Sequence, residues 1–353
     1  MDRLQYNVVD MNLNNGLGKV ILKNKMLLQG VALHKTMMQA CRHSNGVDWW
    51  LLKQGEYDTN RIYRFLVKAD TIEGPWIQNF AEPKYPSYDL TGQYAFTKDG
   101  TKFASIQGKI NKLFIADFDR CTGELNNLVV RNVPIDSTTI PNAGPSYLMD
   151  SISNGVCFSS NGKYVYITKR YNIYQYELDD PDSNSAWYSV QHGPDTTYQK
   201  FQYYAHQALG IDGRIYIGNW GGQHKQMSVI NKPDIKGAGC QFCRKCFRID
   251  TNLAIGITAP PNMPDYTLGA SGQVCWPLQS VSVREQSELW EIYPNPATTI
   301  FYIKNAAGKK KALYNMIGTK LFSTYKDEID IKKYAKGIYF IRCEGVSKKV
   351  IIE

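Results

Sequence analysis

The chain has 353 residues, and its 24 Tyr, 13 Phe and 28 Gly favour strands and turns over helices. Its formal net charge is +9, but residues 292–353 hold twelve Lys and Arg against five Asp and Glu, so the preceding residues are nearly neutral. A body that binds nucleic acid is expected to carry its own basic face, and the composition therefore excludes that function. No apolar run approaches the length of about eighteen residues that a transmembrane helix needs.

The chain starts without a recognisable export signal. Residues Met1 to Tyr6 lack the basic segment and the following apolar segment that define a signal peptide. Either the sequence begins inside a longer protein, or the chain is never exported. The repeats described next favour the first explanation.

Residues 1–278 contain a repeated sequence pattern: an alternating hydrophobic strand, a polar turn that ends in Gly, and a second strand. The four turns are Asn45-Gly46, Asp99-Gly100, Asn161-Gly162 and Asp212-Gly213. Gly after Asn or Asp permits the positive φ of a tight hairpin. Repeats of about fifty residues with several short strands each predict an all-β propeller of four or more four-stranded blades.

Third strands are expected at residues 62–66, 113–118 and 173–178, and partial blades at 4–30 and 250–278. A closed ring would need further blades, so we expect the propeller to be incomplete at its N-terminal side. Residues 279–291 contain no turn-and-strand phrase and are interpreted as a linker to a second domain at 292–353.

The sharpest chemical pattern is Cys240-x-x-Cys243-x-x-Cys246. Three such thiols can hold zinc if Cys275 or His224 supplies a fourth ligand. The spacing also begins a bacterial ferredoxin motif, but the fourth cysteine and proline of that motif are missing here. In an oxidising exterior the four cysteines would form disulfides instead. We expect disulfides or structural thiols, with zinc as the alternative, and no cofactor.

Candidate catalytic residues are few. No G-x-S-x-G or HExxH motif accompanies the five histidines, which are expected to be structural: His34, His43, His192, His206 and His224. Acidic residues of a central pocket, such as Asp48, Glu56 or Asp58, could serve an extracellular hydrolase or lyase if two carboxylates lie about 5–10 Å apart. That enzyme is the alternative to a non-enzymatic protein.

Two further patterns have features of ligand-binding sites. Asp117-x-Asp119 resembles the start of a calcium loop, but the twelfth position is Leu128 where such a loop needs Glu, so a turn is expected. Trp49 and Trp50 are expected to be buried blade aromatics, whereas Trp220, in a Gly-rich segment, is equally consistent with burial and with stacking on a sugar ring.

In residues 300–352, apolar and polar side chains alternate in short stretches. Runs of β-branched and aromatic residues separated by turns predict a small Ig-like β-sandwich: 300–304, 311–315, 319–322, 337–342 and 348–352. Pro294 and Pro296 fix φ and remove two amide donors, so an extended entry precedes the first of these strands.

The same residues carry a family resemblance. YPNPA at 293–297, LYNMIG at 313–318, GIY at 337–339 and KKVIIE at 348–353 resemble the C-terminal sorting domain of the type IX secretion system of Bacteroidetes, with Asn315 in place of the usual Asp. The resemblance assigns the sorting signal to Tyr293, Pro294, Asn295, Pro296, Gly318, Gly337, Tyr339, Lys348 and Lys349. It implies recognition by the outer-membrane export machinery, removal by a sortase-like peptidase, and release or attachment to anionic lipopolysaccharide.

The body also carries a resemblance. The segments ADFDRCTGEL at 116–125 and GIDGRIYIG at 210–218 resemble the WD-repeat-like propellers of large Bacteroidetes surface proteins. We therefore expect a secreted or cell-surface protein of the outer membrane, in which the propeller is a binding or scaffold module for an unknown protein or glycan.

Overall fold

The computed structural model describes residues 2–55, 61–80, 92–108, 111–135, 153–193, 203–219, 226–248, 259–273, 275, 290–316, 319–343 and 346–353. The chain divides into two compact units, Met1–Pro277 and Leu278–Glu353. Each is described by itself. No helix in these residues is long and apolar enough to cross a membrane.

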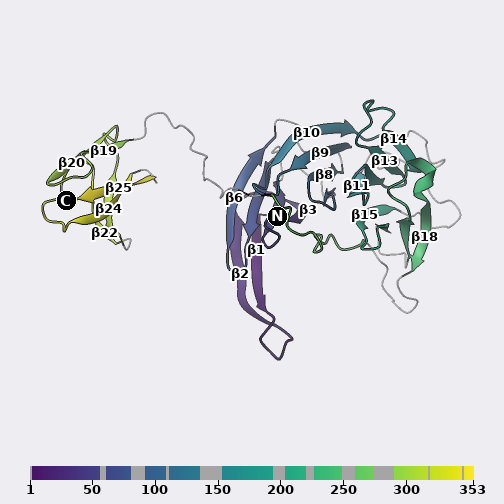
Figure 1. Cartoon of the computed structure of the whole chain (residues 1–353), viewed down its shortest axis with the longest axis horizontal. Coiled ribbons are helices and arrows are strands. Elements are labelled where there is room, and N and C mark those ends of the chain that lie inside the picture. Colours follow the sequence, from purple (N-terminus) through teal and green to yellow (C-terminus); the bar gives the residue numbers. More distant parts are fainter. Residues whose placement is uncertain are drawn as a thin grey trace. The chain divides into compact units, whose positions relative to one another are not determined.

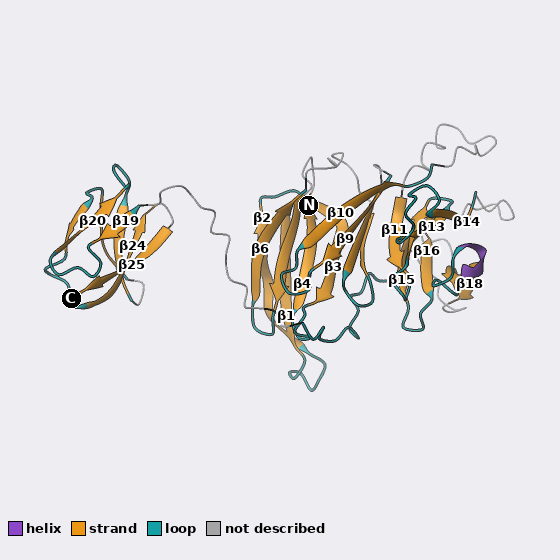
Figure 2. Ribbon diagram, turned by 45° about the horizontal axis from the view of Figure 1, so that its top comes forward, coloured by secondary structure: helices purple, strands orange, loops and turns teal. Residues whose placement is uncertain are grey.

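In the described residues of the first unit, four antiparallel sheets have four strands each, and in each of these sheets the strands pair in chain order. Figures 1 and 2 show how these sheets follow one another along the chain. The first sheet is β3 (Leu33–Arg42), β4 (Trp49–Gly55), β5 (Arg61–Val67) and β6 (Ile72–Asn79). The second is β7 (Gly92–Phe96), β8 (Lys102–Gln107), β9 (Lys112–Phe118) and β10 (Leu125–Asn132). The third is β11 (Ser153–Phe158), β12 (Tyr164–Lys169), β13 (Ile173–Glu177) and β14 (Trp187–Gln191). The fourth is β15 (Tyr204–Leu209), β16 (Ile215–Asn219), β17 (Gln226–Ile230) and β18 (Phe242–Arg248), with the short 3-10 helix η2 (Gly237–Cys240) before β18.

The hairpin turns confirm the repeat that the sequence predicts. In every sheet the turn between the first and second strand contains a Gly with positive φ: Gly46 (73°), Gly100 (72°), Gly162 (72°) and Gly213 (79°). Only Gly adopts this backbone without strain against a Cβ atom, so these residues fix where each hairpin reverses. The first strands β3, β7, β11 and β15 contact one another in that order, as the inner strands of propeller blades do.

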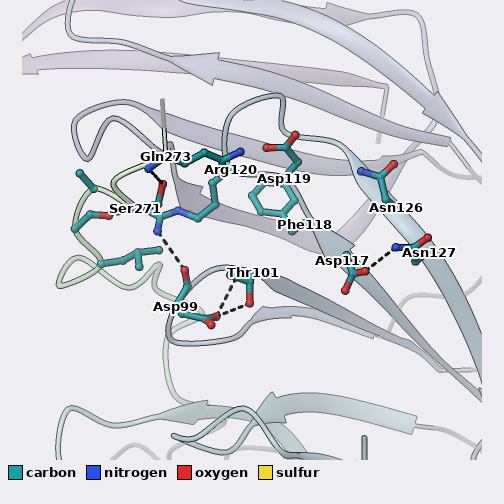
Figure 3. A pocket seen from close by; sticks show the side chains of 13 residues that line it. Asp99, Thr101, Asp117, Phe118, Asp119, Arg120, Asn126, Asn127, Ser271 and Gln273 are labelled. Carbon is teal, nitrogen blue, oxygen red and sulfur yellow. Dashed lines mark hydrogen bonds between the residues drawn. The ribbon is translucent and has the colours of Figure 1, made fainter. Parts of the chain in front are cut away.

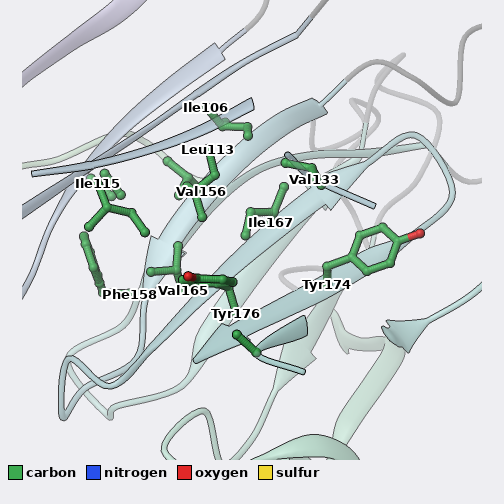
Figure 4. Packing of buried hydrophobic residues seen from close by; sticks show 13 residues of the cluster. Ile106, Leu113, Ile115, Val133, Val156, Phe158, Val165, Ile167, Tyr174 and Tyr176 are labelled. Atoms are coloured by element: carbon green, nitrogen blue, oxygen red, sulfur yellow. The ribbon is translucent and has the colours of Figure 1, made fainter. Parts of the chain in front are cut away.

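Neighbouring blades share apolar cores. Between the second and third blades, residues of β8, β9, β11, β12 and β13 interlock (Figure 4), among them Ile106, Ile115, Val156 and Ile167. Comparable clusters join the first blade to the second around Trp50, and the third to the fourth around Tyr166. Each fully buried aliphatic or aromatic side chain contributes about 1.5–3 kcal/mol, so these shared faces hold consecutive blades together.

Both predicted partial blades differ from a full blade. At the N-terminal side, β1 (Arg3–Asp10) and β2 (Lys19–Gln29) form a two-stranded hairpin whose base packs on the first blade through Leu4, Leu27 and Leu28. At 250–278, the described residues 259–273 and 275 contain no strand. We call residues 259–275 the strap, because they cross the first and second blades as an irregular segment.

The second unit is a β-sandwich, as predicted. One sheet contains β19 (Glu291–Tyr293), β20 (Ile300–Lys304) and β23 (Glu328–Asp330). The other contains β22 (Lys320–Thr324), β21 (Lys311–Asn315), β24 (Gly337–Cys343) and β25 (Val346–Ile352), in that order. Alternate residues of both sheets meet in one core that includes Trp290, Phe301, Leu313 and Ile341. Each strand thus buries one face, which is the reason for the alternation in its sequence.

Candidate functional site

A pocket of about 640 Å³ lies beside the strap in the first unit (Figure 3). Its volume is within the range of small-molecule sites in proteins. Three stretches line it: the first hairpin turn of the second blade, the end of β9 with the start of β10, and the strap. The lining residues are Asp99, Thr101, Asp117, Phe118, Asp119, Arg120, Asn126, Asn127, Leu268, Gly269, Ala270, Ser271 and Gln273.

The carboxylates of this pocket are held by hydrogen bonds within their own turns. Asp99 Oδ1 accepts from the Thr101 amide at 3.0 Å and from the hydroxyls of Thr97 and Thr101. Asp119 Oδ1 accepts from the Cys121 amide at 2.8 Å and so closes the turn after β9. These oxygens shape the backbone that forms the pocket.

Asp117 has two side-chain partners. Its Oδ1 accepts from Lys102 Nζ at 2.9 Å, and its Oδ2 accepts from Asn127 Nδ2 at 2.8 Å. The hydrogen bonds from Asn127 and Lys102 lower the pKa of the Asp117 carboxyl. Partial burial opposes ionisation of Asp99, but the hydrogen bonds from Thr97 and Thr101 outweigh that cost and lower its pKa as well. Both groups are therefore ionised at neutral pH and act as acceptors.

The guanidinium of Arg120 is used by the protein itself. Arg120 is buried, with 5% of its surface exposed. Its Nε donates to the Arg42 carbonyl at 2.9 Å, and its terminal nitrogens donate to the carbonyls of Asp99, His43 and Gly269. One side chain thus joins the first blade, the second blade and the strap. The donors of Arg120 are therefore engaged within the protein, while its positive charge remains at the pocket.

Lowered carboxyl pKa values give the first unit a defined acid sensitivity. A carboxyl whose folded pKa lies below its unfolded value of about 4 contributes stability above pH 4, and loses it as pH falls through the folded pKa. We expect the unfolding free energy to fall below pH 4, and to fall less steeply in Asp99→Asn, which keeps an acceptor for the Thr101 amide. Urea unfolding from pH 7 to pH 2.5 measures this. Asp70→Asn removes one carboxylate from the exposed turn between β5 and β6 and is the matched control. If both variants reduced the pH dependence of the unfolding free energy equally, the assignment to Asp99 would be contradicted.

The four candidate cysteines are divided between two disulfides and one buried thiol. Cys275 forms a disulfide with Cys121, a residue 154 positions away that the sequence did not single out. Cys243 and Cys246, both in β18, are paired with each other. Cys240 is 1% exposed and lies in the core between the third and fourth blades.

The structure therefore does not bring the four candidate zinc ligands together. Among the described residues, no group of three or more His, Cys, Asp or Glu side chains is arranged to hold a metal ion. The possible fourth ligand His224 lies outside those residues, as does Trp220.

The other candidates from the sequence are dispersed. Asp48, a half-buried residue just before β4, accepts from Asn45 Nδ2 at 2.8 Å, whereas Glu56 and Asp58 lie outside the described residues. Trp50 is fully buried, and Trp49 is half-buried beneath Arg42, whose guanidinium lies 4.3 Å from its ring.

Of the histidines, His43 belongs to the surroundings of the pocket. Its Nδ1 accepts from the Asn45 amide at 3.0 Å, and its Nε2 lies 3.2 Å from the Cys121 carbonyl. His34 accepts from the amides of Thr36 and Met37, while burial lowers the pKa of His206. His34 is thus held within its own blade, His43 contacts the second blade, and His206 forms a hydrogen bond with the backbone of Gly92 in β7.

In the second unit, the two ends of the sorting signal meet. Asn295 Nδ2 donates to the Lys349 carbonyl at 2.9 Å, and Asn295 Oδ1 accepts from the Ile351 amide at 2.8 Å. Ala297 continues this contact, since its amide donates to the Ile351 carbonyl and its carbonyl accepts from the Glu353 amide. The YPNPA turn therefore clamps the last strand, although more than fifty residues separate them.

The remaining signal residues support the same sandwich. Lys348 Nζ donates to the Trp290 carbonyl at 2.6 Å and lies over the Trp290 ring, while Tyr339 donates its hydroxyl proton to the Ala335 carbonyl. Gly337 opens β24 with φ at 156°. Tyr293 is half exposed and stacks on Tyr302, with ring centroids 5.7 Å apart. Pro294 and Pro296 lie in the clamping turn, and Gly318 lies outside the described residues.

The fold defines an all-β protein with four propeller-type blades and a C-terminal sandwich that carries a sorting signal. Residues 291–353 match the family model of the secretion system C-terminal sorting domain, and the chain thus ends in a domain of that family. Such a domain implies export to the cell surface or the exterior through the type IX machinery. A search of curated protein sequences found no match.

Solved structures with similar arrangements are distant. The putative 6-phosphogluconolactonase of Bacteroides uniformis aligns at 14% identity over 64% of this chain and 60% of its own, with a TM-score of 0.40. The Dos1 propeller aligns at 11% identity over 69% and 57%, with a TM-score of 0.41. The periplasmic gluconolactonase PpgL of Pseudomonas aeruginosa aligns at 14% identity over 92% and 79%, with a TM-score of 0.41. The chain thus spans about three fifths of the first two structures.

Proposed function

We propose that this protein is an exported, non-enzymatic binding protein. The propeller blades present a ligand pocket outside the cell, and the C-terminal sandwich directs export. After export a sortase-like peptidase cleaves near residues 279–291, and the body is released or attached to anionic lipopolysaccharide. The observation that carries the proposal is the sorting domain at 291–353, with its YPNPA turn clamped to the terminal strand.

The chemistry of the pocket supports binding over catalysis. A general acid needs a raised pKa so that it holds a proton at neutral pH, whereas the pKa values of Asp99 and Asp117 are lowered. Hydrogen bonds that build the local turns also occupy these carboxylates. A glycosidase needs one protonated and one ionised carboxyl group on either side of the scissile bond. A carboxyl group with a lowered pKa does not supply the proton.

Deleting residues 291–353 tests the export role. In the producing bacterium we expect the truncated body to stay in the periplasm, because the export machinery no longer finds the sorting domain. The amount of body labelled by antibody at the cell surface should fall at least tenfold. Surface labelling with an antibody against the propeller, together with cell fractionation, measures the distribution. The full-length Thr298→Ala variant, changed at an exposed tail residue, is the control. Normal surface display of the truncated chain would refute the proposal.

A further inference from the structure

The strap lies on the protein surface with little apolar burial. None of its described residues, 259–273 and 275, is fully buried, and half-buried positions such as Asn262 and Leu268 are a minority. It contains no strand, so few backbone hydrogen bonds hold it. A segment of this kind gains little from the hydrophobic effect and opens easily unless something else fixes it.

The inner end of the strap is anchored by one amide side chain. Asn262 Oδ1 accepts from Gln39 Nε2 at 2.9 Å and from Gln93 Nε2 at 3.2 Å, and its Nδ2 donates to the Met38 carbonyl at 3.1 Å. Gln39 and Gln93 belong to β3 and β7, the inner strands of the first two blades. The strap therefore starts beside the inner strands.

Further along, the strap makes isolated contacts with both blades. Tyr266 packs edge-on against Trp49, and Leu268 touches the apolar cluster around Trp50. The Ser271 amide donates to the Ser44 carbonyl at 3.1 Å. Gly46 has no side chain to obstruct this approach, since a Cβ atom there would lie 2.7 Å from the Ala270 amide nitrogen. These contacts place the strap without enclosing it.

The outer end is covalently fixed. Cys275 is bonded to Cys121, in the turn between β9 and β10, and that turn also supplies Asp119 and Arg120 to the pocket. Leu268, Gly269, Ala270, Ser271 and Gln273, which lie between Tyr266 and the disulfide, form the third wall of the pocket. The pocket is complete only while this wall is in place.

We propose that the Cys121–Cys275 disulfide is a clasp that closes the strap once the chain has left the cytosol, so that the pocket is assembled only in an oxidising compartment. The inference deepens the proposed function, because it takes the pocket as the binding site. Cytosolic thiols are kept reduced, whereas the exterior permits disulfides. In the clasping step the two Sγ atoms form one S–S bond. A disulfide donor, R–S–S–R, accepts the two electrons and two protons and leaves as two thiols.

Hydrogen exchange of the full-length chain tests the clasp without any ligand. At labelling times of seconds to minutes, we expect peptides covering 262–273 to exchange at least tenfold faster in Cys121→Ser/Cys275→Ser than in the oxidised protein, while β7–β9 exchange as before. Wild-type protein treated with a phosphine reductant should show the same change, which guards against a folding defect of the variant. Cys243→Ser/Cys246→Ser removes the other pair and is the matched control.

Two results would overturn the clasp. Unchanged exchange of 262–273 without the disulfide would show that the non-covalent contacts hold the strap by themselves. Equally faster exchange in the strap and in β7–β9 would show that the disulfide stabilises the whole second blade and not the strap in particular. Neither result depends on export or on a ligand, so failure of the clasp is distinguishable from failure of the proposed function.

Alkylation of protein made in a reducing and in an oxidising compartment tests the timing. Cys275, which is half-buried, should be alkylated only in the first sample. Cys41 and Cys157 are buried, and burial raises the pKa of each thiol to about 12, so they stay unreactive in the folded protein and serve as internal controls. A Cys121–Cys275 bond already formed in the reducing compartment would contradict closure outside the cytosol.

Discussion

Removing the Cys121–Cys275 disulfide is expected to lower the unfolding free energy of the first unit by about 3–5 kcal/mol. The bond joins residues 154 positions apart, so it restricts a long loop of the unfolded chain and removes much of its entropy. The double variant Cys121→Ser/Cys275→Ser should therefore unfold at a lower urea concentration, as measured by tryptophan fluorescence of the full-length chain.

The control for this change is the second pair. Cys243 and Cys246 are three positions apart, so Cys243→Ser/Cys246→Ser should cost about 2 kcal/mol or less by the same relation. The tail unit has its own core around Phe301 and Leu313, and its unfolding should shift in neither variant. Equal losses from both cysteine pairs would contradict the long-loop explanation.

Replacing Asn295 by Ala is expected to lower the unfolding free energy of the tail sandwich by about 2–3 kcal/mol. The change removes the hydrogen bonds to the Lys349 carbonyl and from the Ile351 amide, and leaves both backbone groups without this partner. A unit of this size has only about 3–9 kcal/mol of total stability. Faster hydrogen exchange at 346–352 and a reduced fraction of surface-exported protein measure the effect.

Thr298→Ala, three residues away and exposed, is the matched control for Asn295→Ala. It should leave both exchange and export unchanged. If Asn295→Ala loosened the last strand while export stayed normal, the export machinery would be reading the sequence of the tail and not its folded form. A loss of export with an unchanged fold would instead assign Asn295 to direct contact with that machinery.

Turn chemistry and alternation allowed much of the fold to be predicted. Asn45-Gly46, Asp99-Gly100 and their two counterparts mark the hairpins because positive φ is a property of single residues. The third strands were predicted from short hydrophobic runs, which are likewise local in the sequence. A partial blade was predicted at 4–30, where β1 and β2 form a hairpin, but the irregular strap and the Cys121–Cys275 pair were not predicted, since each depends on which surfaces meet after folding.

The sequence alone determined the four-stranded blades, the tail sandwich and the family of residues 291–353, because their signals lie within stretches of about ten residues. Only the tertiary structure decided which cysteine bonds to Cys275, how Asn295 clamps the last strand, and where the pocket lies. These features join residues more than fifty positions apart, and their pairing follows from the path of the chain through packed blades and not from spacing in the sequence.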